Sequence, residues 1–123
     1  MVMNLFFADA PVIDTLRSES RLISTVGQKV IISCRANGNP PPRYTWTKDD
    51  QQIKPKSHSN VKLLGKDIIV FPKHIKDFGV YECAAKNELG TAHHTVSLVE
   101  VADKGKMLFN KGKMVYIVRA VGG

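Results

Sequence analysis

Two cysteines, Cys34 and Cys83, constrain the fold of this chain more than any other feature, and they lie far apart in the sequence. A zinc site needs about four ligands, usually with a close pair of Cys or His residues, and no such pair accompanies them. A disulfide is the better interpretation. Closing so long a loop constrains the unfolded chain by roughly 4 kcal/mol in the entropy model. Such a bond indicates an oxidising compartment.

The chain has the size and composition of one globular domain with short flanks. It contains 123 residues, of which 43% are hydrophobic and 24% are charged, and these values argue against disorder throughout. The formal charge of +7 favours acidic partners, although it is also what keeps an ordinary surface soluble. No apolar stretch reaches the length of a transmembrane helix. The first ten residues lack a basic segment and make a poor signal peptide.

Short extended segments separated by turn signals follow one another from Gly27 to Val101. Alternating or apolar runs predict strands near residues 29–34, 44–48, 61–64, 68–71, 80–86 and 92–101. The Asn, Gly and Pro cluster at 37–42 and the polar segment 48–51 predict turns. Seven or so short strands at this spacing indicate an all-β sandwich of two antiparallel sheets.

Cys34, Trp46, Tyr81 and Cys83 form the most specific pattern in the sequence. A sandwich core is about 10 Å thick, so a disulfide between the sheets passes through its centre. A tryptophan on a neighbouring strand can lie against the sulfur atoms and fill the space around them. Tyr81 precedes Cys83 by two residues and therefore faces the same side, where its hydroxyl can reach an upstream carbonyl.

Two longer motifs resemble the intermediate-set (I-set) immunoglobulin domains. The segment 36–49, ANGNPPPRYTWTKD, matches the pattern Ala-x-Gly-x-Pro-x-Pro-x-x-x-Trp-x-Lys-Asp, and the segment 83–90, CAAKNELG, matches Cys-x-Ala-x-Asn-x-x-Gly. The resemblance implies an immunoglobulin-like Greek-key sandwich over residues 10–101. Residues 1–9 are then an N-terminal flank, and residues 102–123 are a basic C-terminal flank. The residues of these motifs are similar to those of adhesion and receptor members such as the contactin, L1, Dscam and receptor tyrosine phosphatase groups.

The resemblance also implies structural roles for single residues. Asp77 and Gly79 belong to the tight turn before Tyr81, and Asp77 is expected to pair with a base, for which Lys62 is the candidate. Ala85 is expected to be small because it faces the core beside the disulfide. Asn87 is expected to bridge the following turn with its amide, and Gly90 to supply a positive φ there.

Two positions depart from the family pattern. Lys73 stands where an apolar residue is usual, so Ile75 or Phe71 is expected to fill that space instead. In the last strand, either Val96 and Leu98 or the alternate pair Val99 and Val101 can face inward, which leaves the register open or indicates a bulge.

No constellation of residues indicates catalysis, and the sequence predicts no enzyme, cofactor or metal site. A G-x-S-x-G nucleophile motif and a Gly-rich phosphate loop are both absent. The adjacent residues His93 and His94 point to opposite faces of a strand and cannot hold one metal ion. All four histidines are expected at the surface, and the other two are His58 and His74.

Function is therefore expected to be binding, through the sheet faces and end loops of the sandwich. The stiff Pro-rich loop 37–43 is one candidate surface for a protein ligand or a homophilic partner. Scattered bases are a second candidate, for a sulfated glycan such as heparan sulfate. The possible binding residues are Arg43, Lys48, Lys54, Lys56, Lys62 and Lys66, with Lys73 and Lys76 in the same stretch. No nucleic-acid partner is expected.

The favoured interpretation is a protein-recognition module of an extracellular or cell-surface protein, in a chain that is a piece of a longer one. The alternative is an intracellular filament domain of the titin type with both thiols reduced. In the C-terminal flank, apolar segments on either side of Asn110–Lys113 predict a hairpin. An isolated hairpin is marginally stable, so this flank is expected to be disordered or loosely docked.

Overall fold

A computed structural model describes residues 8–54, 60–101, 107–110 and 113–116, and the side chains up to residue 101. The strands in chain order are β1 (Asp9–Ile13), β2 (Arg21–Ser24), β3 (Val30–Ser33), β4 (Ala36–Asn39), β5 (Arg43–Lys48), β6 (Gln51–Gln52), β7 (Val61–Leu64), β8 (Asp67–Val70), β9 (Gly79–Asn87), β10 (Gly90–Glu100), β11 (Met107–Asn110) and β12 (Lys113–Tyr116). The 3-10 turn η2 (Ile75–Asp77) lies between β8 and β9.

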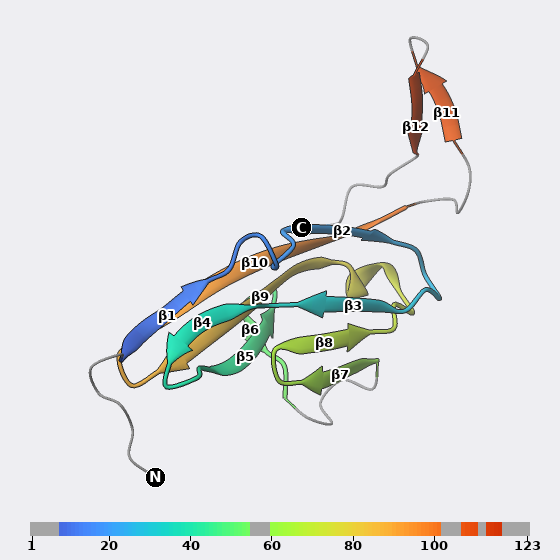
Figure 1. Cartoon of the computed structure of the whole chain (residues 1–123). Coiled ribbons are helices and arrows are strands. Elements are labelled where there is room, and N and C mark those ends of the chain that lie inside the picture. Colours follow the sequence, from blue (N-terminus) through green and yellow to red (C-terminus); the bar gives the residue numbers. More distant parts are fainter. Residues whose placement is uncertain (1–7, 55–59, 102–106, 111–112, 117–123) are drawn as a thin grey trace.

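Two sheets form the two layers of a sandwich (Figure 1). The five-stranded sheet has the order β2-β10-β9-β5-β6, and the three-stranded sheet has the order β3-β8-β7. Strands β1 and β4 form a separate antiparallel pair. β2 runs parallel to β10, whereas the other pairings are antiparallel. The predicted all-β sandwich is confirmed, and the polar segment after β5 adds the short strand β6.

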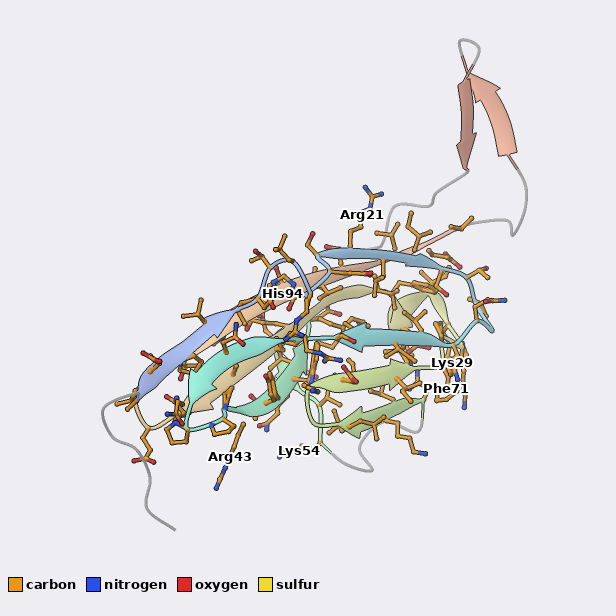
Figure 2. The ribbon with its side chains drawn as sticks, in the orientation of Figure 1. Arg21, Lys29, Arg43, Lys54, Phe71 and His94 are labelled. Carbon is orange, nitrogen blue, oxygen red and sulfur yellow. A yellow bond between two sulfur atoms is a disulfide. The ribbon has the colours of Figure 1, made fainter. Side chains whose placement is uncertain are left out.

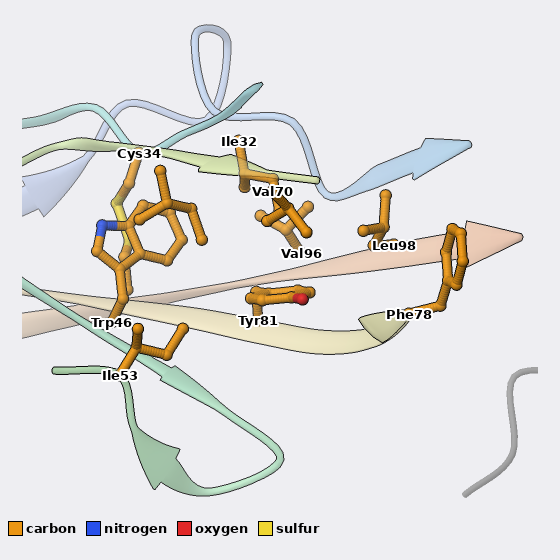
Figure 3. Packing of buried hydrophobic residues seen from close by; sticks show 11 residues of the cluster. Ile32, Cys34, Trp46, Ile53, Val70, Phe78, Tyr81, Val96 and Leu98 are labelled. Atoms are coloured by element: carbon orange, nitrogen blue, oxygen red, sulfur yellow. A yellow bond between two sulfur atoms is a disulfide. The ribbon is translucent and has the colours of Figure 1, made fainter. Parts of the chain in front are cut away.

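The core lies between the two sheets and is built from alternate residues of the facing strands (Figure 3). The three-stranded sheet contributes Ile32, Ile68 and Val70, all fully buried. The five-stranded sheet contributes Trp46, Tyr81, Cys83, Val96 and Leu98, and segments that adjoin the strands add Cys34, Ile53 and Phe78. Burial of apolar surface stabilises a fold by about 25 cal/mol for each Å² removed from water, so these buried side chains supply most of the favourable free energy of folding.

The last strand resolves the register that the sequence left open. Val96 and Leu98 are fully buried, and β10 pairs with β9 from Gly90 to Leu98 without a register shift. Val99 points to the opposite face, because neighbouring residues of a strand alternate. The core therefore takes the first of the two sets that the sequence allows, and no bulge is needed.

The expectation for the space beside Lys73 is wrong. Ile75 is 48% exposed and Phe71 is 43% exposed, so neither fills that position. Pro72 is fully buried, and Phe78 is buried at the end of the core. A proline ring and an aromatic ring from the connector between β8 and β9 thus supply the apolar volume that Lys73 lacks.

The turns that the sequence predicts are present, although the first of them begins later than predicted, because residues 36–39 form strand β4. Asp49 and Asp50 join β5 to β6 with φ values of 49° and 67°, as a tight two-residue turn requires. The Asn, Gly and Pro cluster is not wholly a loop, because its first residues belong to β4 at the outer pairing with β1. The prolines follow this strand and connect it to β5.

The C-terminal flank contains the predicted hairpin. β11 and β12 pair in antiparallel register from Met107 with Tyr116 to Asn110 with Lys113. How this hairpin docks stays a prediction, as do the domain boundaries at residues 10 and 101. Among the described residues, no helix has the length and apolar character to cross a membrane.

Candidate binding surface

The disulfide and the tryptophan fix the centre of the sandwich beneath the candidate surface. Cys34 and Cys83 are bonded, with a Cα–Cα distance of 6.5 Å, and both are fully buried. Trp46 lies beside them, and its indole Nε1 donates a hydrogen bond of 3.0 Å to the Gly65 carbonyl. Ala85 is also fully buried, as its predicted position beside the core requires. These contacts tie β5 and β9 to the three-stranded sheet.

Tyr81 and Asp77 form the predicted tyrosine corner. The Tyr81 hydroxyl donates a hydrogen bond of 2.6 Å to the Asp77 carbonyl, and burial together with the nearby carboxylates of Asp77 and Asp49 raises the pKa of this phenol. The Asp77 carboxylate accepts hydrogen bonds from the backbone amides of Lys73, at 2.8 Å, and His74, at 3.0 Å.

The expected Asp77–Lys62 ion pair is wrong. Among residues 8–54 and 60–101, no ion pair joins these two side chains. Partial burial on its own would raise the pKa of Asp77, but the two amide hydrogen bonds and the Asn60 side chain lower it below its usual value. Backbone donors in the connector thus replace the expected base, because a carboxylate that accepts several amide hydrogen bonds is stabilised in its charged form.

Asn87 joins three segments at one end of the five-stranded sheet. Its Nδ2 donates to the carbonyls of Asp9, at 2.7 Å, and Pro40, at 3.1 Å. Its Oδ1 accepts from the Leu89 amide at 2.8 Å. The predicted bridging role is therefore present, and it extends beyond the turn to β1 and to the Pro-rich connector.

The role expected of Gly90 is wrong. Gly90 has no positive φ, and among the described residues the glycines with a positive φ are Gly27, Gly65 and Gly79. A Cβ at Gly90 would lie 3.4 Å from the Cβ of Ala10, so a small residue here lets β1 pass close to β10. The turn between β9 and β10 forms without a left-handed residue, because the Asn87 side chain holds it.

Gly79 opens β9 in a conformation that favours glycine, with a φ of 139°. A Cβ there would meet Asp49 Oδ1 at 3.2 Å and Lys48 Nζ at 3.4 Å. The side chains of Lys48 and Asp49 form an ion pair through Nζ and Oδ2, and Lys48 Nζ also lies 5.7 Å from the centre of the Tyr81 ring. The Lys48 side chain is only 15% exposed, so it is a structural cation and not part of an open binding surface.

A hollow of about 640 Å³ lies over the outer face of β5, β9 and β10, at the end where the Pro-rich connector enters β5. Arg43 pairs directly with Lys86 across β5 and β9, and Lys86 pairs directly with Thr91 across β9 and β10. Pro40 and Pro41 form one wall, and Ala84 is the small residue behind the two bases. The hollow is thus lined by a stiff connector, by two cations and by one acidic residue, Glu88.

Arg43 and Lys86 have no carboxylate partner among the described residues. Directly opposed residues in an antiparallel pair place their Cβ atoms about 5 Å apart, and like charges in that position repel. Both side chains are exposed, and Figure 2 shows Arg43 extending away from the sheet. An anionic group that binds between them removes this repulsion, so the geometry is suited to a carboxylate or a sulfate.

The other predicted bases do not join this site. Lys48 lies on the opposite face of β5 from Arg43, because an odd number of positions separates them. Lys62 lies on β7, and Lys66 lies in the turn between β7 and β8, in the other sheet. Lys54 follows β6, and Lys56 lies outside the described residues. The six bases that the sequence singled out therefore do not form one cluster.

His93 and His94 point to opposite faces of β10, as expected. His93 faces outward on β10, 3.5 Å from the Glu82 carboxylate, whereas the ring of His94 lies 2.9 Å from the Glu19 carbonyl. His74 is exposed, and His58 lies outside the described residues. No group of three or more His, Cys, Asp or Glu residues able to hold a metal occurs in the described part of the chain.

Sequence reasoning missed Lys86 as a partner of Arg43. The two residues lie far apart in the chain, and only the register of β5 with β9 brings them together. One signal was present in the sequence: Trp46 and Cys83 were expected on neighbouring strands. If those two pair directly, as they do, counting three positions outward from each in antiparallel register leads to Arg43 and Lys86.

The disulfide, the buried tryptophan and the strand order together define an immunoglobulin-type sandwich. The family model of the immunoglobulin I-set domain matches residues 13–99, and the chain belongs to this family. It is 34% identical to human sialic acid-binding Ig-like lectin 12 over 80% of this chain and 16% of that protein. It is 32% identical to mouse contactin-6 over 73% of this chain and 8% of that protein. The chain thus spans less than a fifth of the length of these relatives.

Solved structures show the same fold. The tandem Ig repeats of Dlar match with a TM-score of 0.65 and 30% identity, over 76% of this chain and 49% of that one. Titin domain M7 matches with a TM-score of 0.67 and 25% identity, over 77% of this chain and 97% of that one. The fold is therefore common to adhesion and receptor proteins and to a filament protein, and it does not by itself separate the two groups.

Proposed function

We propose that this chain is a non-catalytic recognition module of an extracellular or cell-surface adhesion or receptor protein, and that it forms part of a larger multi-domain chain. Its ligand is another protein that presents an acidic group to the hollow beside Arg43 and Lys86. The observation that carries this proposal is the direct pairing of these two cations on an open sheet face without a carboxylate partner in the described residues.

The framework around the hollow supports binding with little loss of conformational freedom. The Tyr44 hydroxyl accepts a hydrogen bond from the Ala36 amide and donates one to the Ala36 carbonyl, at 3.2 and 3.3 Å. Asn87 holds Pro40 from the other side. A surface that is already ordered before binding keeps more of its interaction energy as affinity. The adhesion and receptor relatives are consistent with such a role.

The test is a binding screen of the whole chain, displayed as a multimer, against an array of extracellular proteins. We expect at least one specific ligand, whose binding falls about tenfold or more when Arg43→Glu and Lys86→Glu are introduced together, since charge pairs that are desolvated on binding contribute a large share of affinity. Lys62→Glu on the other sheet is the matched control and is expected to leave this binding unchanged. Equal binding by the double variant and the wild type contradicts the proposal.

A filament domain of the titin type is the second candidate, and the match to titin domain M7 favours it. The two candidates differ in the redox state of Cys34 and Cys83, because cytosolic thiols are kept reduced. Protein isolated from its native source under denaturing conditions can be labelled with a thiol reagent before and after reduction. The recognition module is expected to take up label only after reduction. Two free thiols before reduction identify the filament domain.

A sulfated glycan is a further possible ligand for the bases of this chain, and the same array separates it from a protein. Heparin immobilised beside the protein array is expected to bind the wild type no better than the variant that carries Arg43→Glu and Lys86→Glu. Heparin binding that is stronger than binding to every protein in the array, and that is lost in this variant, assigns the hollow to glycan recognition instead.

A further inference from the structure

The outer face of the three-stranded sheet carries exposed aliphatic and aromatic side chains where polar ones are usual. Ile31 on β3 and Leu64 on β7 are each 53% exposed, and Phe71 just after β8 is 43% exposed. Ile69 lies between them on β8, partly exposed. Scattered apolar residues on a surface are ordinary, but contiguous apolar patches mark interaction sites.

The register of the sheet places these side chains next to one another. Ile31 pairs directly with Ile69, and Ile69 pairs directly with Lys62. Phe71 lies two positions after Ile69 on the same face. Leu64 lies on the neighbouring strand β7, diagonal to Ile69, and both residues are within reach of long side chains. The four residues, which we call the apolar row, are Ile31, Leu64, Ile69 and Phe71.

The apolar row has a cause that is visible in the sequences of β3 and β8, two neighbouring strands of this sheet. Strand β3 reads VIIS, and the β8 segment with the residue after it reads DIIVF. An antiparallel sheet with one solvated face shows alternation of apolar and polar residues, whereas continuous apolar runs are typical of strands covered on both faces. In β3 and β8 the inner residues form the core, and the outer residues Ile31 and Phe71 are exposed among the described residues, with Ile69 partly exposed.

Bases surround the apolar row. Lys62 lies in the same cross-strand line as Ile31 and Ile69, and Lys66 lies in the turn that follows β7. Lys29 precedes β3 at the end where Phe71 lies, and Figure 2 shows the two residues at the same end of the sheet. None of these three lysines has an ion-pair partner among the described residues. The one acid on this face, Asp67, is paired with Arg35 at 2.7 Å.

We propose that the apolar row is a second interaction surface, and that it binds a partner protein with an apolar centre and Asp or Glu side chains at its edge. The charge around the row decides this choice. A second copy of this chain would bring the same basic edge against itself, and like charges juxtaposed across an interface cost binding energy. An acidic edge satisfies Lys29, Lys62 and Lys66, while apolar side chains cover Ile31 and Ile69.

This surface lies on the opposite sheet from the hollow at Arg43 and Lys86, so the two sites do not compete for the same face of the sandwich. The module is thereby able to hold two ligands at once, one on each sheet. The second site does not depend on the first, because no residue is shared between them.

The experiment is a selection of random peptides displayed on phage against the immobilised whole chain, with prior removal of peptides that bind the variant Ile31→Thr/Ile69→Thr. Threonine keeps the β-branch that suits a strand and removes the apolar contact. We expect the selected peptides to be rich in aromatic or aliphatic residues together with Asp or Glu. As synthetic peptides, they are expected to bind the wild type about tenfold or more tighter than the threonine variant.

Two further variants separate this surface from general stickiness and from loss of folding. Lys29→Glu/Lys62→Glu is expected to weaken the same peptides, because the acidic edge loses its partners. Val80→Thr is the matched control, since Val80 is 46% exposed on the outer face of the other sheet, and it is expected to change nothing. Thermal unfolding of each variant establishes that the sandwich is intact.

Three outcomes overturn the proposal. Selected peptides that bind wild type and threonine variant equally show that the apolar row is not a binding surface. A dimer of the wild type in sedimentation equilibrium that the threonine variant abolishes assigns the row to a second copy of the chain. Binding to vesicles of phosphatidylcholine and phosphatidylserine that exceeds peptide binding, and that the same variant loses, assigns it to a membrane surface.

Discussion

The two outer faces of this sandwich differ in chemistry, although both cover the same core. The five-stranded sheet presents a hollow lined by the opposed cations Arg43 and Lys86, by Glu88, by threonines and by a small alanine, and it carries the Glu82–His93 pair and the exposed Ile23 and Val80 elsewhere. The three-stranded sheet presents the apolar row with lysines around it. The first face is suited to a discrete anionic group, and the second is suited to a broad apolar contact.

The difference indicates that the two sheets divide structural and binding roles unequally. In β9, residues alternate between the core and solvent, with Tyr81, Cys83 and Ala85 buried. In β3 and β8 the apolar residues continue on both sides. A strand that needs only to cover a core has no reason to be apolar on its outer side. The excess apolar character of the three-stranded sheet therefore supports the second interaction surface that we propose.

The largest expected effect concerns two neighbouring residues of β8, Ile68 on the core side and Ile69 on the outer side. Ile68 is fully buried, and Ile68→Ala is expected to lower the free energy of unfolding by about 3 kcal/mol through lost burial and a cavity. Ile69→Ala on the outer side is expected to cost less than about 1 kcal/mol, as for other surface positions. Urea unfolding of both variants measures the difference. Equal losses would mean that the outer face is already covered within the chain.

The tyrosine corner tests how firmly β9 is anchored under the five-stranded face. Tyr81→Phe removes the hydroxyl that donates to the Asp77 carbonyl and keeps the ring in the core. We expect a loss of about 1 kcal/mol in the free energy of unfolding, the usual net value of such a hydrogen bond. Tyr44→Phe, at the other end of the sheet, removes a pair of longer hydrogen bonds to Ala36 and is the comparison. A Tyr81→Phe variant as stable as wild type refutes the anchoring role.

The dependence of stability on acid pH tests two carboxylates, Asp67 at the start of β8 and Asp77 in the connector between β8 and β9. Partial burial alone would raise the pKa of Asp67, but hydrogen bonds from Arg35 and Ser33 and the charges of Arg35 and Lys66 lower it, and the pKa of Asp77 is lowered as described above. Because both folded-state values lie below the 3.8 of the unfolded chain, the stabilisation is fully present above that pH. It is lost as the pH falls through the folded-state values.

The corresponding variants are Asp67→Asn and Asp77→Asn. Each is expected to be less stable than wild type at neutral pH and to show a smaller further loss on acidification, as measured by urea unfolding at a series of pH values. Asp14→Asn in an exposed ion pair with Arg17 is the control, since exposed pairs contribute little. An unchanged acid dependence in both variants contradicts the assigned hydrogen bonds.

The smallest expected effect concerns the opposed cations. Arg43→Thr is expected to raise the free energy of unfolding by about 0.3 kcal/mol, because it removes a like-charge pair that lies directly across two strands. The gain is expected to shrink as salt is added, since exposed charges are screened. Arg21→Thr at the edge strand β2 is the control. A loss of stability in Arg43→Thr means that the two cations do not repel each other in the free domain.

The sequence was sufficient for those parts of the fold that depend on local spacing. Cys34, Trp46, Tyr81 and Cys83 specify the core because each one's face follows from alternation along its own strand. The predictions that failed involve contacts between segments. Phe71 and Ile75 were expected inside, but a buried proline between them took the space. Lys62 was expected to reach Asp77, but backbone amides were closer.

The candidate sites were harder to predict for the same reason. Arg43 was singled out from its loop, but its partner Lys86 depends on the register of β5 with β9. The apolar row was readable in principle as unbroken apolar runs in two strands, yet only the pairing of Ile31 with Ile69 shows that they form one surface. The neighbours of a charged or apolar side chain depend on how the strands pair in the tertiary structure. The spacing of residues along one strand does not reveal that pairing.

The most direct measurement is the reactivity of single lysines in the complex with a ligand found in the extracellular protein array. Acylation followed by mass spectrometry reports how accessible each lysine is before and after binding. Lys86 is expected to become protected while Lys48, already in its ion pair with Asp49, stays unchanged, and the protection is expected to disappear with Arg43→Glu. Full reactivity of Lys86 in a saturated complex would contradict recognition through the hollow.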